Sequence, residues 1–224
     1  MEVGAERIHQ IVRSLRLFSR LDESELKPVD LHEGIENTLL LLQHRLRAKG
    51  DTPEIEVVKN YCQLPLITCY ASQLNQVFMN LLSNAIDALE SQSAPRRITL
   101  CTELGDGSWG QRDQQGAYEE TKRPGDKETQ TAFIPSPQVQ FPMSNSQSVI
   151  IRIADNGAGM NQEVQHQIFD PFFTTKPVGS GTGLGLAISY QIVEKHQGHI
   201  SCISTLGQGA EFIVEIPLTA KADH

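Results

Sequence analysis

Two glycine clusters, separated by an aromatic loop that bears a lysine, hold the residue types best suited to chemistry in this chain. The first cluster places Asp155 just ahead of Gly157 and Gly159, and the second, residues 179–185, runs straight into an apolar segment with helical periodicity. Glycine lets a ligand approach the backbone because no Cβ blocks the way. A glycine-rich loop that leads into a helix offers free N–H groups to an anion such as phosphate. A carboxylate in one cluster and Lys176 between the two predict a nucleotide held at both ends.

A helix expected over residues 73–90 carries a second set of useful side chains. Its apolar positions form a buried face, and four polar residues at four-, four- and three-residue steps line the adjoining stripe: Gln76, Asn80, Asn84 and Asp87. Asparagine is a mediocre helix former, and a merely solvated face would be better served by Lys, Glu or Gln. The stripe therefore favours a functional surface over a solvated one.

Composition and charge exclude several classes of protein. The chain has 224 residues, of which 39% are hydrophobic, so a real core can form. Its net charge of −8, without a polybasic run, argues against nucleic acid as a partner. Its apolar runs fall short of the roughly 20 residues that a membrane span needs, and no signal-peptide pattern opens it. Four scattered cysteines without metal-ligand spacing fit buried apolar roles and a reducing, cytoplasmic setting.

Helices are expected to position both sets of residues. An apolar stripe over residues 5–21 is typical of a bundle or coiled-coil helix. Asp30 is expected to cap a helix that begins at Leu31 and stops at Gly50, and Ser72 to cap the helix over 73–90. A last helix is expected over about 183–196.

Strands are expected over six segments: 55–60, 65–70, 96–104, 148–155, 199–204 and 210–218. We expect 96–104 to pair with 148–155, and Gly207 and Gly209 to supply a hairpin between the last two. Residues 105–147 are rich in Gly, Gln, Ser, Pro and charge, which predicts a flexible insertion. The resulting fold is an α/β sandwich, in which a mixed, largely antiparallel sheet carries one helical layer and follows a truncated bundle helix.

The asparagine-bearing helix, the aspartate-led glycine turn and the glycine-rich loop together resemble the ATP-binding domain of histidine kinases. This is a branch of the GHKL, or Bergerat, fold shared with gyrase, Hsp90 and MutL. The motifs match in order and approximate spacing from about Pro28 to Leu218. The resemblance divides the chain into 1–27, the end of the dimerisation (phosphoacceptor) helices with a linker, and 28–220, an ATP-binding domain carrying the insertion 105–147. It implies ATP and Mg²⁺ as cofactors.

The resemblance also implies roles for individual residues. The segment QVFMNLLSNAIDAL matches the asparagine box of the family, in which Asn84 would complete the coordination of Mg²⁺, and an amide oxygen suits this hard cation. Asp155 would accept a hydrogen bond from the adenine amine, while Gly157 and Gly159 would let the base lie against the backbone.

The segment IFDPFFTTKPVGSGTGLGL resembles the phenylalanine box and second glycine box of the family, which form an ATP lid. Lys176 is the candidate for a γ-phosphate contact as a flexible point charge, with a solvated loop lysine as the alternative. Backbone N–H groups of five successive residues would meet the phosphate chain: Gly181, Thr182, Gly183, Leu184 and Gly185.

Two positions depart from related patterns. Members of the fold that hydrolyse ATP activate water with a glutamate four residues before the Mg²⁺ asparagine, and that position here is Asn80. An amide cannot serve as a general base, so Asn80 is a candidate catalytic and nucleotide-binding residue in a site that hydrolyses poorly. Asp87 stands where many kinases have a basic residue that touches phosphate. It is a candidate nucleotide-binding residue, although an acid there is expected to reach water or a neighbouring side chain.

The phosphoacceptor histidine of the family, which is followed directly by an acidic residue, has no clear match. His9 precedes Gln10, and His32 precedes Glu33 but begins the helix after the linker. We therefore expect either a fragment of a longer sensor kinase or a protein that phosphorylates histidine in trans. The expected partners are histidine-bearing dimerisation helices, a response regulator receiver domain and, in a full-length protein, a second copy in a homodimer.

The hypothesis from sequence is the catalytic domain of a two-component sensor histidine kinase, which donates the γ-phosphoryl group of ATP to a histidine for relay to a response regulator. A GHKL-type ATPase and a nucleotide-binding interaction module without transfer activity remain alternatives. Membrane contact by this segment is not expected.

Overall fold

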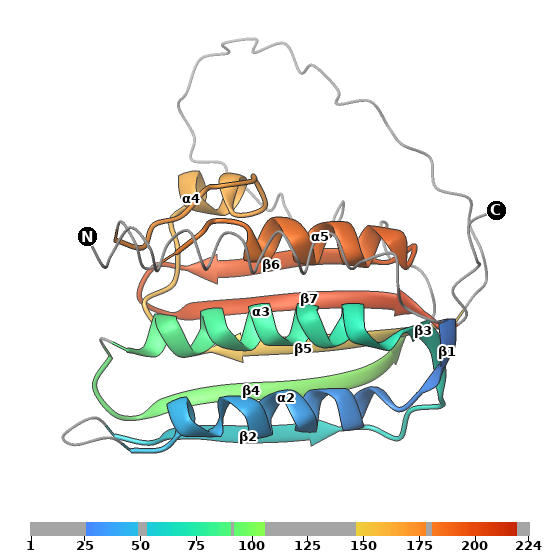
Figure 1. Cartoon of the computed structure of the whole chain (residues 1–224). Coiled ribbons are helices and arrows are strands. Elements are labelled where there is room, and N and C mark those ends of the chain that lie inside the picture. Colours follow the sequence, from blue (N-terminus) through green and yellow to red (C-terminus); the bar gives the residue numbers. More distant parts are fainter. Residues whose placement is uncertain (1–25, 49–52, 91, 106–146, 178–180, 219–224) are drawn as a thin grey trace, which may run out of the picture.

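A computed structural model of the chain describes residues 26–48, 53–90, 92–105, 147–177 and 181–218 (Figure 1). Five strands form the main sheet in the order β2 (Ile55–Tyr61), β4 (Arg96–Gly105), β5 (Ser148–Asp155), β7 (Gly209–Pro217) and β6 (His199–Thr205). Among these five described strands, only β2 and β4 pair in parallel. The expected mixed, largely antiparallel sheet is confirmed.

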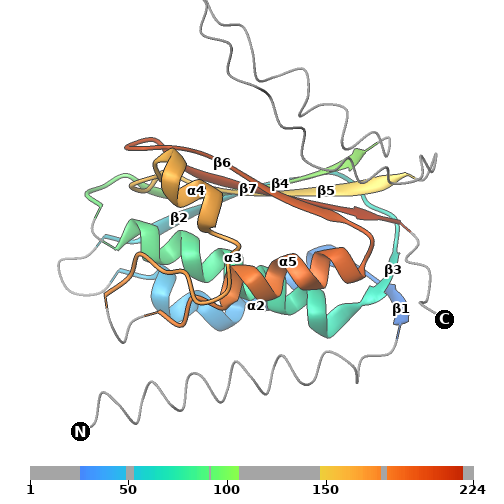
Figure 2. The same cartoon turned by 90° about the horizontal axis from the view of Figure 1, so that it is seen from above.

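One helical layer covers one face of this sheet. The helices α2 (Leu31–Leu46), α3 (Ala71–Leu89) and α5 (Gly185–Lys195) lie side by side, with α3 in the middle (Figures 1 and 2). A short α4 (Gln162–Gln167) lies apart from them, beside β6, where the Gln165 amide donates to the Ser204 carbonyl over 2.9 Å. A two-stranded sheet of β1 (Leu26–Val29) and β3 (Ile67–Tyr70) lies at one end of the helical layer. The predicted α/β sandwich is confirmed.

The core lies between the helical layer and the sheet. The central helix α3 contributes most of the largest fully buried side chains of that layer: Leu74, Phe78, Leu81, Leu82 and Leu89. Full burial of such a side chain stabilises the fold by about 1.5–3 kcal/mol. Because α3 packs on α2, α5 and the sheet, its polar stripe is held in a fixed place. None of the described helices combines the length and the apolar character that crossing a membrane demands.

Local patterns predicted most of these elements. The Asp30 side chain accepts a hydrogen bond from His32 N over 2.9 Å and caps α2 as expected. The pairing of β4 with β5 joins Gly105 to Ser148, so the two strands meet on either side of the proposed insertion. The β6–β7 hairpin is also confirmed, with Gly207 and Gly209 at φ values of 79° and 88°.

Several predicted boundaries were wrong. Helix α3 begins at Ala71 with Tyr70 at its N-cap, so Ser72 lies inside the helix and does not cap it. Helix α2 ends at Leu46, four residues before the expected stop at Gly50, because the backbone of Arg47 is already extended. Helix α5 begins at Gly185 rather than 183, since the residues before it belong to the loop.

Two elements were not anticipated. Strand β1 contains Pro28, which has no N–H to donate, but each strand of a two-stranded sheet is an edge strand and tolerates proline. Helix α4 spans six residues, too few to show periodicity, and Asn161 caps it by accepting from Val164 N. The helix expected over 5–21, nearly all of the domain division at 1–27 and nearly all of the insertion at 105–147 lie outside the described residues.

Candidate functional site

The aspartate-led turn begins where β5 ends. The Asp155 side chain is buried, with 8% of the residue exposed, and its Oδ1 accepts a hydrogen bond from Gly157 N over 2.8 Å. Burial raises the pKa of the Asp155 carboxyl, and the N–H groups of Gly157 and Ala210 act in the opposite direction. A buried carboxyl that is only partly compensated gains from each further donor that reaches it.

The two glycines of this turn are required by packing within the protein. A Cβ on Gly157 would lie 2.7 Å from the Ala88 carbonyl oxygen, so the turn is pressed against α3. Gly159 has a φ of 64°, and a Cβ there would lie 2.0 Å from the Thr205 carbonyl oxygen. Because these two glycines have no side chain, the turn after β5 can pack closely on α3 and on the β6–β7 hairpin. A role of the two glycines in admitting a base stays a prediction.

On α3, Asn80 is bonded to α5. Its Nδ2 donates to the Gly185 carbonyl oxygen over 2.8 Å and to Ser189 Oγ over 3.1 Å, while its Oδ1 accepts from Gln76 Nε2 over 2.8 Å. Gly185 is the first residue of α5, so Asn80 fixes the start of that helix against α3.

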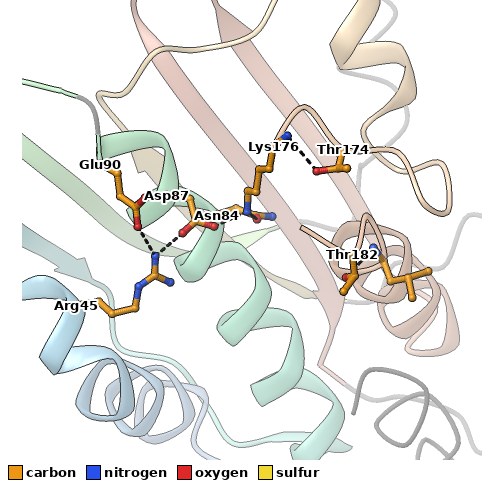
Figure 3. Close-up of polar contacts among 8 residues, drawn as sticks. Arg45, Asn84, Asp87, Glu90, Thr174, Lys176 and Thr182 are labelled. Atoms are coloured by element: carbon orange, nitrogen blue, oxygen red, sulfur yellow. Dashed lines mark hydrogen bonds and ion pairs between the residues drawn. The ribbon is translucent and has the colours of Figure 1, made fainter. Parts of the chain in front are cut away.

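One turn further along α3, Asn84 and Asp87 both contact the ammonium group of Lys176, which lies in the loop before α5. Lys176 Nζ lies 3.1 Å from Asn84 Oδ1 and forms an ion pair with Asp87 Oδ2 (Figure 3). The other carboxylate oxygen of Asp87 pairs with Arg45 of α2, whose guanidinium also lies 3.1 Å from Glu90 Oε1. The expectation that Asp87 reaches a neighbouring side chain is confirmed. Lys176 is bonded to α3 in the structure and is not a freely solvated loop lysine.

The described parts of the loop between α4 and α5, residues 168–177 and 181–184, contact each other near this cluster. Phe172 N donates to the Gly183 carbonyl oxygen over 2.9 Å, and a Cβ on Gly183, which has a φ of 66°, would lie 2.3 Å from the Phe172 backbone. Phe172 itself is 72% exposed, while the Phe169 ring lies 5.7 Å from the Tyr190 ring. We call residues 168–177 and 181–184 the lid loop.

The expected row of N–H groups leads from this loop into α5. No side-chain hydrogen bond caps α5 in the described structure, and its N-cap is Leu184. The N–H of Leu184 makes a long 3.4 Å contact with Thr182 Oγ1. Gly181 packs against the lid loop itself, since a Cβ there would lie 2.7 Å from Thr174 Oγ1. The N-terminus of α5 thus combines an uncapped first turn with the positive end of the helix dipole.

Sequence reasoning missed two residues of the cluster. Arg45 lies 42 positions before Asp87, and nothing in the local pattern of α2 marks it as a partner. Ser189 is fully buried and also donates to the Gly185 carbonyl oxygen over 2.9 Å. A small polar residue on the otherwise apolar face of α5 was the available signal for Ser189.

Comparison with known proteins links the part of the chain that carries Asp155 and Lys176 to a known family. Residues 127–220 match the family described as histidine kinase-, DNA gyrase B-, and HSP90-like ATPase. The chain is 33% identical to the signal transduction histidine-protein kinase AtoS of Escherichia coli over 97% of its length, and 32% identical to the two-component sensor PprA of Pseudomonas aeruginosa over 100%. It spans only 28% of AtoS and 20% of PprA.

Solved structures agree with this assignment. The catalytic domain of the histidine kinase ThkA is 25% identical with a TM-score of 0.58, over 88% of this chain and 97% of that one. Full-length ShkA, solved in complex with AMPPNP, shares the fold at 24% identity with a TM-score of 0.66, over 98% of this chain and 38% of that one. Residues 127–220 therefore match the histidine kinase-, DNA gyrase B- and HSP90-like ATPase family, and the chain is a homologue of sensor histidine kinases with the fold of their catalytic domain.

Proposed function

We propose that the chain binds Mg·ATP between the Asp155 turn, α3 and the lid loop, and donates the γ-phosphoryl group to a histidine on dimerisation helices. The observation that supports this proposal is that Asn84 Oδ1 contacts Lys176 Nζ over 3.1 Å and lies on the same helix, α3, against which the turn of the buried Asp155 packs at Ala88. An amide oxygen and a mobile ammonium suit a metal–phosphate group, while a buried carboxyl suits the amine of a base.

Adenine is proposed to lie at the Asp155 turn, where Gly157 and Gly159 form the backbone beside it. The raised pKa of Asp155 supports this assignment, because a buried carboxyl gains from a donor such as the adenine amine. A guanine base would present a carbonyl oxygen at that position instead, so selectivity for adenine follows.

Mg²⁺ is proposed to bind Asn84 Oδ1. That oxygen already accepts a hydrogen bond from the Lys176 ammonium, which indicates that the position suits a positive charge. Bound Mg²⁺ would supply neutralisation of the phosphate charge, and it takes most of its shell from water and phosphate oxygens. Asn84 therefore needs to contribute one oxygen only.

The phosphate chain is proposed to lie at the start of α5. The N–H groups from Gly181 to Gly185, together with the helix dipole, would bind it, and Lys176 would contact the γ-phosphate. Asn80 would hold α5 in place, since its amide already bonds Gly185 and Ser189. In the transfer, a nitrogen of the acceptor histidine bonds to the γ-phosphorus as the bond to the β-bridging oxygen breaks, and ADP leaves. Catalysis rests on position and charge.

Transfer is favoured over hydrolysis for a chemical reason. Asn80 occupies the position of the water-activating glutamate of related ATPases, and its amide cannot take a proton near neutral pH.

His32 is a poor internal acceptor, because its ring stacks on Tyr61 at 4.4 Å and its Nε2 bonds Thr102 Oγ1 over 2.9 Å. We therefore propose an acceptor on dimerisation helices, relay to a response regulator receiver domain, a homodimeric full-length protein and a cytoplasmic location.

The test is transfer of labelled phosphate. The chain is incubated with γ-labelled ATP, Mg²⁺ and a separately expressed dimerisation-helix pair that carries a His-Glu dipeptide. Label that is lost in acid but stable in base, and absent with Asp155→Asn, supports the proposal. Acid-stable label would indicate a hydroxyl acceptor, steady phosphate release without acceptor would indicate an ATPase, and binding without either would indicate an interaction module. Each of these three results contradicts it.

A further inference from the structure

The Asp87 carboxylate is shared between two cations from different elements. One oxygen pairs with Arg45 at the end of α2, and the other pairs with Lys176 of the lid loop (Figure 3). All three side chains are between 26% and 33% exposed, so their charges are only partly screened by water. The lid loop is thereby connected through α3 to α2.

The same lysine also covers the proposed metal ligand. Asn84 and Asp87 are three residues apart on α3, so their side chains lie on one face and both contact the Lys176 ammonium. An ammonium 3.1 Å from Asn84 Oδ1 and a Mg²⁺ ion bound to that oxygen would repel each other strongly, because both are cations at the same amide oxygen.

We infer that Asp87 is a positioning residue that holds Lys176 on Asn84, so that binding of Mg²⁺ with nucleotide requires release of the lysine, and that Arg45 weakens this hold. The inference rests on the proposed function. It explains why an acid is acceptable at position 87 close to phosphate: its charge is balanced by Arg45 and by Lys176.

Removing the Asp87 carboxylate and removing its partner Arg45 have opposite consequences. Without the carboxylate, Lys176 keeps only the neutral amide of Asn84, and Mg²⁺ displaces it more easily. Without Arg45, the whole charge of Asp87 attracts Lys176, and Mg²⁺ displaces it less easily. Partly exposed ion pairs are weak, so each change should be about two- to five-fold.

The experiment measures nucleotide binding by calorimetry at a series of Mg²⁺ concentrations and reports the Mg²⁺ concentration that gives half-maximal binding. Asp87→Asn is expected to lower this concentration and Arg45→Gln to raise it, each by about two- to five-fold. The matched control is Glu36→Gln, which removes another ion pair of α2, with Lys59 at 2.7 Å; the contacts described for Glu36 are with β2 and not with the lid loop. It should leave the value unchanged. Thermal unfolding of each variant verifies that it is folded, and Arg45→Met, which also removes the charge but keeps an unbranched side chain, replaces Arg45→Gln if the latter does not fold.

The outcomes separate the alternatives. A higher half-maximal Mg²⁺ concentration for Asp87→Asn would mean that Asp87 helps to bind the metal, and equal values for all variants would mean that the ion pairs have no role in binding; both overturn the inference. The proposed function fails differently: the unmodified chain would then bind ATP no better than Asp155→Asn does.

Discussion

Replacement of Asn80 by alanine tests whether this residue acts on the fold or on the nucleotide. The substitution removes two hydrogen bonds that the Asn80 amide donates to α5 and one that it accepts from Gln76. Each is worth about 1 kcal/mol net, so the free energy of unfolding should fall by about 2–3 kcal/mol. For a domain of this size the melting temperature should drop by about 5–10 °C.

Asn84→Ala is the matched comparison, because it removes the same side chain one turn along the same helix. The contact described for the Asn84 amide is the one with Lys176 at 3.1 Å. Its loss should cost less than about 1 kcal/mol of stability, yet Mg²⁺-dependent nucleotide binding should be lost. Asn80→Ala should weaken binding mainly by loosening the start of α5.

Urea unfolding and calorimetric ATP titration of both variants make the measurement. The reasoning is refuted if Asn80→Ala unfolds at the same urea concentration as the unmodified chain while ATP binding disappears. Asn80 would then act on the nucleotide directly. Equal destabilisation by the two substitutions would refute the assignment of a mainly structural role to Asn80 and a mainly nucleotide-binding role to Asn84.

Three further predictions concern buried or strained positions. Asp155→Asn should abolish adenine-nucleotide binding in calorimetry and raise the melting temperature at neutral pH. A carboxyl whose pKa is raised by folding stabilises the fold when it is protonated, and this stability is lost as the pH rises through that pKa. A lower melting temperature for Asp155→Asn would contradict the burial argument. His196 accepts from Tyr70 N and donates to the Ile192 carbonyl oxygen, and burial lowers its pKa. The unfolded chain therefore binds more protons below pH about 6.5, and urea unfolding should show stability falling from that pH downwards, with a flatter profile in His196→Gln. Gly159→Ala should destabilise the fold by about 3 kcal/mol in the same assay, since its φ is positive and the new Cβ would meet the Thr205 carbonyl.

Local patterns were sufficient for the elements that carry the site. Helix α3 follows from its apolar periodicity, and the β4–β5 pair follows from two apolar segments on either side of a polar, glycine-rich stretch. The capping role of Asp30 follows from its side chain and the helix behind it. In each case the decisive interaction joins residues close in sequence or repeats a simple period.

Elements that depend on distant partners could not be predicted in this way. Strand β1 exists because Leu26 pairs with Tyr70, more than forty residues away, and its proline argued against a strand. The side chain of Ser72 is a good helix cap, but the chain was already helical at Ala71, so the cap preference did not decide the boundary. Tertiary packing overrode local preference at both positions.

The site was predictable as a set of residue types but not as a set of contacts. Its stripe on α3 was visible from spacing alone. The bond from Asn80 to Gly185 spans 105 positions, and the contact from Lys176 to Asn84 spans 92. No period in the sequence connects such residues, and the fold alone determines which of them meet.

The contacts of α3 indicate that Lys176 of the lid loop should move when nucleotide binds and that the start of α5 should stay in place. Asn80 holds the start of α5 through bonds that do not involve the lid loop, whereas Asn84 and Asp87 hold Lys176 of that loop. Release of Lys176 therefore leaves the N-terminus of α5 in place, since the Asn80 bonds are untouched. The part of the proposed phosphate site that lies in α5, from Gly185 onwards, would then be formed before nucleotide arrives, whereas the lid loop, which carries Gly181 to Leu184, would have to rearrange. Preorganised N–H donors bind an anion without the cost of ordering them, so the fixed α5 and the displaceable lysine are complementary parts of one mechanism.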